Sequence, residues 1–401
     1  MISRHEKTGV TEPLPARLQP NKEMIFSGNG SPTPSEFLRE YWQKKPLLIR
    51  QAFPGFIPEL DADDIAGLVS DELAESRLVT GSFPEHDWNL RYGPFTETDF
   101  ASLPEANWTL LVQDVEKHYP PVHSLLDEFS FLPSWRIDDL MVSVAGPGGS
   151  VGPHVDQYDA FLLQAQGTKR WQFTVTFDPA LVPDCELNVL QSFTPEQEWV
   201  LEPGDMLYLP PGVAHHGVAL DQGMTWSIGM RAPSTADLLQ ALGDWLAQNR
   251  AEGQRYQDSG MPLPDRTGEI DAAAIERFCR MLGNIAHDGV DFRSFLGSFL
   301  SSNRLAHEPA PAVKQLDVQA LAKALEQGAI IQHHPWTRLA WLKSEPGAIL
   351  FAAGEEYSCP ADLAEKICTR PVKITNNPDQ AKQQLDLICE LTKQGHLYLQ
   401  L

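Results

Sequence analysis

Six short apolar runs between residues 141 and 232 limit the folds open to this chain more than any other feature. They read MVSVAG, AFLLQAQG, KRWQFTV, QEWVLEPGD, MLYLPPG and MTWSIGMRA, and Gly, Pro and Asp residues mark turns between them. Each run has the length of a strand, and few helical patterns separate one run from the next. This density predicts a mainly β domain built as an antiparallel sandwich or barrel.

Changes in pattern divide the 401 residues into four parts. Residues 1–33 are rich in Pro, Gly and Asn and lack periodicity, so we expect a flexible tail. A capped helix from about Ser35, ended near Lys45 by Pro46, leads into a strand at 47–49 and opens a domain over 34–231. A helical region follows over 232–310, and residues 315–401 read as helix, hairpin, two helices and a strand, which resembles a winged-helix module.

Three apolar stripes with a period near 3.6 mark the helical region. The stripes are Leu238, Leu242, Trp245 and Leu246; Ile275, Phe278, Cys279, Leu282 and Ile285; and Phe292, Phe295, Leu296, Phe299 and Leu300. One interpretation is that these helices cover an end of the barrel. The other is a homodimer interface, because the third stripe is unusually aromatic for a solvated helix.

The formal net charge of −23 disfavours direct nucleic-acid binding and suits a basic protein partner, although acidity can also serve solubility alone. A mean hydropathy of −0.27 and the lack of a long apolar run predict a soluble protein without a membrane segment. The opening residues show no secretory signal. Five widely spaced cysteines without a CxxC pair argue against a disulfide framework, and we expect a cytoplasmic location.

His154 and Asp156 are two residues apart, so on a strand both side chains face the same side. A third ligand comes about sixty residues later, where an apolar strand and a Pro-Pro-Gly turn precede His215. Two histidines and one carboxylate form the facial triad that leaves adjacent metal positions open. His216 would face the opposite way. The competing interpretation is two surface histidines and a capping aspartate.

Lys169 is the second residue with a chemical signal. If AFLLQ and KRWQF are strands, Lys169 shares a face with Trp171 and Phe173. A buried ammonium group requires an anion, and a dicarboxylate that chelates the metal could place its far carboxylate there. 2-Oxoglutarate has this form. A lysine that extends from the barrel rim to solvent explains the pattern too.

These residues resemble those of the JmjC-type 2-oxoglutarate oxygenases, and within them the bacterial ribosomal oxygenases that hydroxylate an arginine of large-subunit ribosomal protein sixteen. The resemblance is carried by RIDDLMVSVAGPGGSVGPHVDQYDAFLLQAQGTKRW, LEPGDMLYLPPGVAHHG and WSIGMRAPS. It implies a mainly β fold with α: a double-stranded β-helix (cupin/JmjC) barrel, a helical dimerisation region and a winged-helix-like C-terminal module. It also implies Fe(II), 2-oxoglutarate and O2, with release of succinate and CO2.

The same resemblance assigns roles to residues. The iron ligands fall on His154, Asp156 and His215, and the residue that holds 2-oxoglutarate falls on Lys169. Ser143 and Ser227 would add hydroxyl contacts to the cosubstrate. The arginine pocket falls on Asp139, Met141 and Tyr158, whereas Asp138 would point to the other side of its strand. The implied substrate is a basic ribosomal protein.

Three alternatives stay open. A cupin-type small-molecule dioxygenase or isomerase would use the same triad without 2-oxoglutarate, but it has no need for an ammonium group at Lys169. A non-catalytic adaptor would have no need for three metal ligands. A lysine demethylase-like oxygenase fits less well, because Asp139 and Tyr158 suit a guanidinium better than an aromatic cage for a methylammonium. The triad alone fixes neither the metal nor the oligomeric state.

Overall fold

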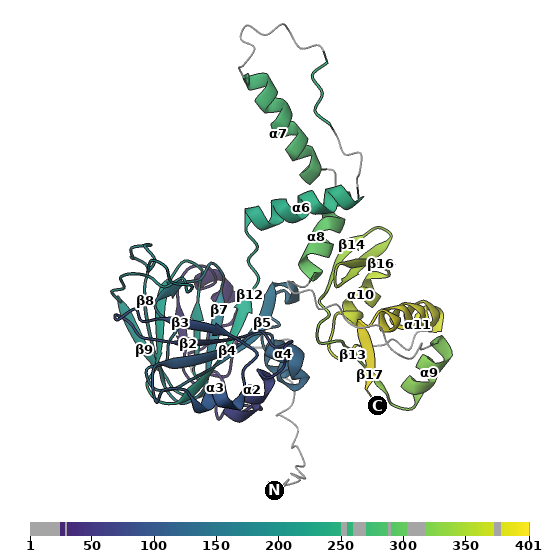
Figure 1. Cartoon of the computed structure of the whole chain (residues 1–401). Coiled ribbons are helices and arrows are strands. Elements are labelled where there is room, and N and C mark those ends of the chain that lie inside the picture. Colours follow the sequence, from purple (N-terminus) through teal and green to yellow (C-terminus); the bar gives the residue numbers. More distant parts are fainter. Residues whose placement is uncertain are drawn as a thin grey trace. The chain divides into compact units, whose positions relative to one another are not determined.

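The computed structural model describes residues 25–28, 30–249, 255–259, 270–287, 290–302, 317–372 and 378–400. The chain forms two compact units, the first from Met1–Pro133 and Ile137–Met230 and the second from Ser134–Arg136 and Arg231–Leu401. The first unit contains the β-barrel, and the second contains the later helices with two small sheets (Figure 1). Among the residues described, no helix is long and apolar enough to cross a membrane.

The first unit begins earlier than the sequence pattern suggested. Most of the tail expected over 1–33 lies outside the described residues, but Ile25 and Phe26 are 0% and 3% exposed. The Phe26 ring lies 5.3 Å from the rings of Phe53 and Phe129. A tail that extends to residue 33 is therefore too long, because these side chains bury apolar surface in the barrel unit's core.

The helices of the first unit are short. They are α1 (Pro34–Glu40), α2 (Ala62–Leu68), α3 (Glu97–Ala101), α4 (Val115–His118) and α5 (His123–Asp127). Thr33 and Glu36 form a capping box at the start of α1. The sequence pattern placed the end of this helix near Lys45, but α1 ends at Glu40. The chain leaves the helix because Gln43 has a φ of 57° and donates its backbone N–H to the Tyr208 hydroxyl at 2.7 Å.

The strands of the first unit form two sheets. They are β1 (Leu47–Ile49), β2 (Ser76–Thr80), β3 (Asn89–Tyr92), β4 (Trp108–Val112), β5 (Ile137–Ala145), β6 (His154–Val155), β7 (Ala160–Gln166), β8 (Lys169–Thr174), β9 (Gln197–Leu201), β10 (Met206–Leu209), β11 (Ala214–Ala219) and β12 (Gly223–Met230). The larger sheet has the order β1-β10-β7-β12-β5-β4-β2-β3, and the smaller sheet β6-β11-β8-β9. The pairings are antiparallel.

The strands from β5 to β12 divide between these sheets in a regular way. β5, β7, β10 and β12 lie in the larger sheet, and β6, β8, β9 and β11 lie in the smaller one. A chain that passes between two facing sheets in this manner is a double-stranded β-helix, which confirms the expected barrel. β1 extends one edge of the larger sheet, and β4, β2 and β3 extend the other.

Side chains of the larger sheet alternate between two faces. On one face, residues such as Leu140, Phe161 and Trp226 join the core that includes Phe37 of α1 and Ile65 of α2. On the other face, a second core fills part of the space between the sheets; its buried members are Ala160, Leu162, Trp171, Leu201, Leu207 and Leu209. Polar residues that share this inward face therefore lie inside the barrel.

The second unit contains the remaining helices and strands. They are α6 (Thr235–Asn249), α7 (Ala272–His287), α8 (Val290–Ser301), α9 (Val318–Glu326), β13 (Ile330–His333), β14 (Leu339–Ser344), β15 (Gly347–Ala352), β16 (Glu355–Cys359), α10 (Ala361–Ile367), α11 (Pro378–Lys393) and β17 (Leu397–Gln400). β13 pairs with β17, and β14, β15 and β16 form a three-stranded sheet. The sequence pattern missed β13 and β16, which are short and only partly apolar.

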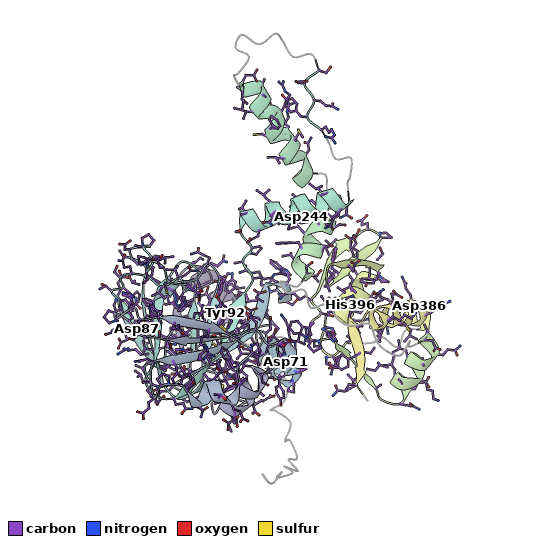
Figure 2. The ribbon with its side chains drawn as sticks, in the orientation of Figure 1. Asp71, Asp87, Tyr92, Asp244, Asp386 and His396 are labelled. Atoms are coloured by element: carbon purple, nitrogen blue, oxygen red, sulfur yellow. The ribbon has the colours of Figure 1, made fainter. Side chains whose placement is uncertain are left out.

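The three helical stripes differ in their surroundings. The aromatic stripe of α8 packs within its own unit: Phe295 is 2% exposed, and its ring centroid lies 6.1 Å from that of Trp245 in α6. Gly297, which lies off this stripe, faces β15, where an added Cβ would clash with the ring of Phe351. The aromatic character of this helix therefore reflects packing within the unit. On α7, by contrast, Ile275, Phe278 and Leu282 are 53%, 50% and 65% exposed, and the side chains of this helix project outward in Figure 2.

Candidate metal centre and the adjacent barrel interior

Three potential metal ligands meet between β6 and β11. His154 and His215 are paired in register on these strands, and their ring centroids are 4.2 Å apart. The Asp156 carboxylate, just after β6, lies 3.9 Å from Nε2 of His154 and 3.6 Å from Nε2 of His215. One ligand atom from each residue can be chosen so that all three lie within 4.8 Å of one another. The structure thus brings together all three residues that the sequence motif singled out.

Backbone carbonyl groups orient both imidazole rings. Nδ1 of His154 lies 2.9 Å from the Gly152 carbonyl oxygen, and Nδ1 of His215 lies 2.9 Å from that of Val213. A carbonyl can only accept, so each Nδ1 carries the hydrogen and each Nε2 of a neutral ring keeps its lone pair toward the cluster. Burial, followed by the charge of His154, lowers the pKa of His215 and thereby favours this neutral form.

The two histidines at the end of the Pro-Pro-Gly turn have different environments. The neighbouring His216 faces away from His215, as an extended strand requires. Its ring packs against Phe83 and Phe193 at centroid distances of 5.6 and 5.9 Å. Its exposed fraction is 6%, and burial lowers its pKa to about 4. Only His215 of this pair joins the cluster.

Lys169 lies inside the barrel, 7% exposed, and does not reach the rim. Lys169 pairs with Ala219 of β11. On the same face of β11, Gly217 lies two residues before Ala219 and His215 lies four residues before it. Nζ lies 3.5 Å from Oγ1 of Thr225 and 4.9 Å from the centre of the Trp171 ring. Burial lowers its pKa to about 8, and no carboxylate of the described residues lies within 4 Å of Nζ.

Hydroxyl and amide groups lie on the inward face of the larger sheet around Thr225. Thr225 donates its hydroxyl to Oε1 of Gln164 at 3.2 Å, and Ser143 lies opposite Thr225 in register. Ser227 is 8% exposed and faces the same side two residues further along β12. Sequence reasoning missed Thr225 and Gln164. Thr225 could have been found from its two-residue spacing to Ser227, whereas Gln164 depends on the pairing of β7 with β12.

Asp139 and Met141 lie further along the inward face of β5, opposite Gly229 and Ser227. A Cβ at Gly229 would lie only 2.9 Å from Oδ1 of Asp139, so glycine leaves room for the carboxyl group. Gln113 donates to Oδ2 of Asp139 at 3.4 Å. The third residue of the expected pocket, Tyr158, is 42% exposed; burial of its phenol group and the nearby Asp156 carboxylate raise its pKa.

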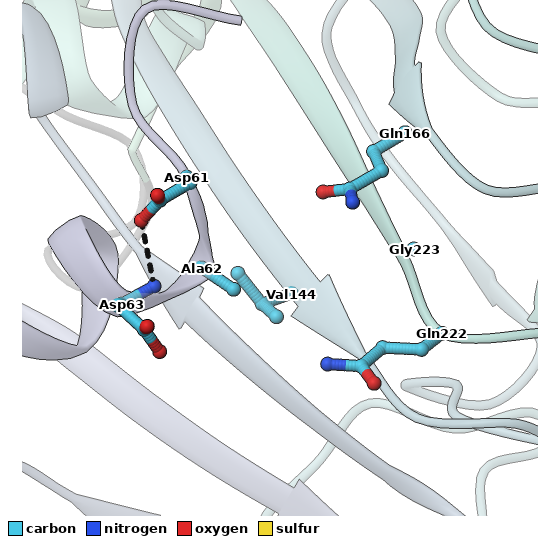
Figure 3. A pocket seen from close by; sticks show the side chains of 7 residues that line it. All are labelled: Asp61, Ala62, Asp63, Val144, Gln166, Gln222 and Gly223. Carbon is cyan, nitrogen blue, oxygen red and sulfur yellow. Dashed lines mark hydrogen bonds between the residues drawn. The ribbon is translucent and has the colours of Figure 1, made fainter.

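A separate cavity of about 190 Å³ lies away from the metal cluster. Its lining includes Asp61, Gln166, Gln222 and Gly223 (Figure 3). The Asp61 carboxylate already accepts the backbone N–H groups of Asp63 and Asp64 at the start of α2. None of the residues predicted for the site lines this cavity, so the chemistry is assigned from the converging side chains in the barrel.

Comparisons with known proteins agree with this arrangement. Residues 124–238 match a JmjC domain, residues 284–398 match a ROXA-like winged helix, and residues 191–291 match an AraC-like ligand binding domain. The chain is 34% identical to the ribosomal protein uL16 3-hydroxylase of Escherichia coli (strain K12) over 327 residues, and this alignment covers 81% of this chain and 85% of that protein. It is also 34% identical over 343 residues to a probable ribosomal oxygenase of Haemophilus influenzae, covering 80% and 81%.

Solved structures show the same likeness. The crystal structure of E. coli YcfD superimposes with a TM-score of 0.83 at 30% identity, over 94% of this chain and 100% of that one. A structure of YcfD, described as a ribosomal oxygenase in complex with cobalt and 2-oxoglutarate, gives a TM-score of 0.79 at 31% identity, over 91% and 98%.

The geometry predicts that replacing His215 abolishes tight metal binding, whereas replacing His216 does not. We expect His215→Ala to weaken binding of a divalent transition metal by at least the order of 10- to 100-fold, because it removes one of three ligands. His216→Ala is the matched control. The measurement is calorimetric titration of metal-free protein with Co²⁺; equal weakening in both variants would contradict the assignment.

Proposed function

Since the chain belongs to the family of JmjC-domain ribosomal oxygenases, we propose that it is an Fe(II)- and 2-oxoglutarate-dependent protein hydroxylase that acts on an arginine side chain of ribosomal protein uL16. The observation that carries this proposal is the cluster of His154, Asp156 and His215 inside the barrel. The similarity to a uL16 3-hydroxylase along most of both chains supports the ribosomal substrate.

The donor set fits ferrous iron. Two imidazole nitrogens and one carboxylate oxygen form the facial arrangement used by non-haem iron oxygenases, in which other positions stay open for ligands. His154, Asp156 and His215 would hold the ion. When bound with 2-oxoglutarate and O2, it supplies the oxidising power for hydroxylation, and the cosubstrate leaves as succinate and CO2.

Lys169 provides the anchor for 2-oxoglutarate. Its buried ammonium group needs a counter-charge, and it lies on the same inward face as His215. A dicarboxylate that chelates the metal at one end would place its other carboxylate on Nζ. The hydroxyl groups of Ser143, Thr225 and Ser227 line the same part of the barrel, where they can donate to the cosubstrate.

Asp139, Met141 and Tyr158 provide the arginine pocket. The Asp139 carboxyl group can accept the planar donor pattern of a guanidinium group, and an aromatic ring and a thioether can cover its flat faces. The net charge of −23 favours approach of a basic protein and disfavours nucleic acid as a direct ligand. A substrate of the ribosome implies a cytoplasmic enzyme.

The alternatives account for less. A small-molecule cupin dioxygenase or isomerase leaves the buried ammonium group of Lys169 without a role, and a non-catalytic adaptor leaves the metal cluster without one. A lysine demethylase would need an aromatic cage for a methylammonium group, and the buried group beside Gly229 is the carboxyl of Asp139.

Hydroxylation is tested by intact-mass spectrometry of uL16 after incubation with the enzyme, Fe(II), 2-oxoglutarate and air. We expect a gain of one oxygen atom, located on an arginine by fragmentation. Reactions without 2-oxoglutarate, and reactions with His215→Ala, should give no gain. Consumption of 2-oxoglutarate without a gain on uL16 would preserve the oxygenase and reject this substrate.

Lys169→Met should raise the KM for 2-oxoglutarate steeply. Loss of a charge-assisted contact costs about 1.5–3 kcal/mol, or roughly a 10- to 150-fold increase, whereas Lys169→Arg keeps the charge and should recover much of the affinity. Because burial lowers the pKa of the free lysine to about 8, the KM in the wild type should also rise as the pH increases through that value. An unchanged KM in Lys169→Met would exclude the anchor.

We further propose that the enzyme is a homodimer joined through α7. Its exposed apolar side chains, Ile275, Phe278 and Leu282, form the surface that a second copy would cover. Light scattering should give a mass near twice 44.6 kDa, and Phe278→Asp with Leu282→Asp should give a monomer. The matched control is Leu239→Asp, on the exposed side of α6; a monomeric wild type would contradict the proposal.

A further inference from the structure

A second buried carboxyl group, that of Glu116, lies at the edge of β5, the strand that carries Asp139. Glu116 belongs to α4, is 3% exposed and accepts the backbone N–H of Leu140 at 3.0 Å. β4 pairs with β5 only as far as Val112, opposite Val142. Beyond the last residue of β4, the Glu116 carboxylate therefore accepts the hydrogen bond from β5 that a paired strand would accept. The donor, Leu140, is the residue after Asp139.

The groups around this pair are mostly acidic. Asp114 and Asp138 act on Asp139 as like charges, while Lys117 and the amide of Gln113 oppose them. Lys117 itself forms an ion pair with Asp114. The charge of Asp139 also acts on Tyr158, in the loop that follows β6. Two buried carboxyl groups in such surroundings cannot both ionise at low cost, since each charge lacks water and repels the other.

The titration of both groups follows from this environment. Burial raises the pKa of Glu116 to about 8; Lys117 counteracts the shift, and Asp139 and Asp114 add to it. Burial, then Asp114 and Asp138, raise the pKa of Asp139 to about 6. Near neutral pH the pair therefore holds about one proton, which resides mainly on Glu116.

We propose that Glu116 is a positioning residue of the substrate pocket, and that entry of a cationic side chain beside Asp139 expels about one proton from the Glu116 and Asp139 pair to the solvent. This inference rests on the proposed function, because it takes Asp139 as the partner of the substrate cation. An entering positive charge favours the ionised form of both carboxyl groups, so binding and proton release are linked. Binding then strengthens as the pH rises.

The linkage also bears on which cation the pocket takes. A guanidinium group keeps its proton at any pH at which proteins fold, so the proton that leaves must come from the pocket. An ammonium group has a lower pKa and can lose its own proton when it is desolvated. Release of a proton from the Glu116 and Asp139 pair is therefore the expected accompaniment of arginine binding.

The test counts the protons released on binding. An arginine-containing uL16 peptide is titrated into enzyme loaded with Fe(II) and 2-oxoglutarate under anaerobic conditions, in two buffers with different ionisation enthalpies, from pH 6 to 9. We expect the wild type to release about one proton near pH 7. Glu116→Gln keeps an acceptor for the Leu140 N–H but cannot ionise, so the release should disappear near pH 7 and above, while the peptide still binds. Glu105→Gln, an exposed carboxyl group in the same unit, should behave like the wild type.

Each outcome decides a separate point. Binding without proton release in the wild type, or equal release in wild type and Glu116→Gln, overturns the linkage and leaves the proposed function intact. If the arginine peptide does not bind, the proposed substrate is wrong, and the pair is then tested in the free enzyme by carboxyl ¹³C shifts. Two coupled titrations above pH 5.5 that become one in Glu116→Gln support the paired carboxyl groups; their absence overturns them.

Discussion

Burial of charged and metal-ligating groups between two sheets is the constraint on which the rest of this structure depends. An unpaired ammonium or carboxylate group in an apolar interior is costly, and the barrel contains both kinds. The remaining inward positions are filled by Leu162, Leu207, Leu209 and Trp171, which hold the sheets together around the polar groups. In the proposed function, ligands of opposite charge would offset this cost.

The alternation of strand residues separates stability from chemistry. In β12, Trp226 and Ile228 face the outer core with α1 and α2, and Thr225 and Ser227 face the interior. The same division holds in β5, where Leu140 and Val142 are outward and Asp139, Met141 and Ser143 are inward. Substitutions on the inward face can therefore change which ligand the barrel binds without removing the apolar side chains that stabilise the sheet.

Much of the site could be predicted from the sequence because two-residue periodicity fixes which side chains share a face. His154 with Asp156, and Lys169 with Trp171, are of this kind, and the structure places them as expected. The end of α1 and the burial of Ile25 and Phe26 could not be predicted in this way, because they depend on contacts with residues far along the chain, such as Tyr208 and Phe129. The sequence shows the aromatic stripe of α8, but no local signal identifies Trp245 of α6 as the ring that packs against Phe295. Glu116 belongs to the same class: α4 has only four residues, and its approach to Leu140 leaves no periodic trace.

The order of charges along the barrel interior bears on how the two proposed ligands, which have opposite charges, would bind. Thr225, which lies beside Lys169, and Gly229, which faces Asp139, are four residues apart on β12. At a strand rise of about 3.3 Å per residue, the cationic and acidic ends are separated by roughly 13 Å. The metal cluster lies on the facing sheet, at β6 and β11, and β11 also pairs with β8, which carries Lys169. In the proposed function, the anionic cosubstrate lies at one end and the cationic side chain of the substrate at the other. Reversing either proposed ligand would place like charges together in a buried space, so Lys169 and Asp139 would fix which way round the two ligands bind.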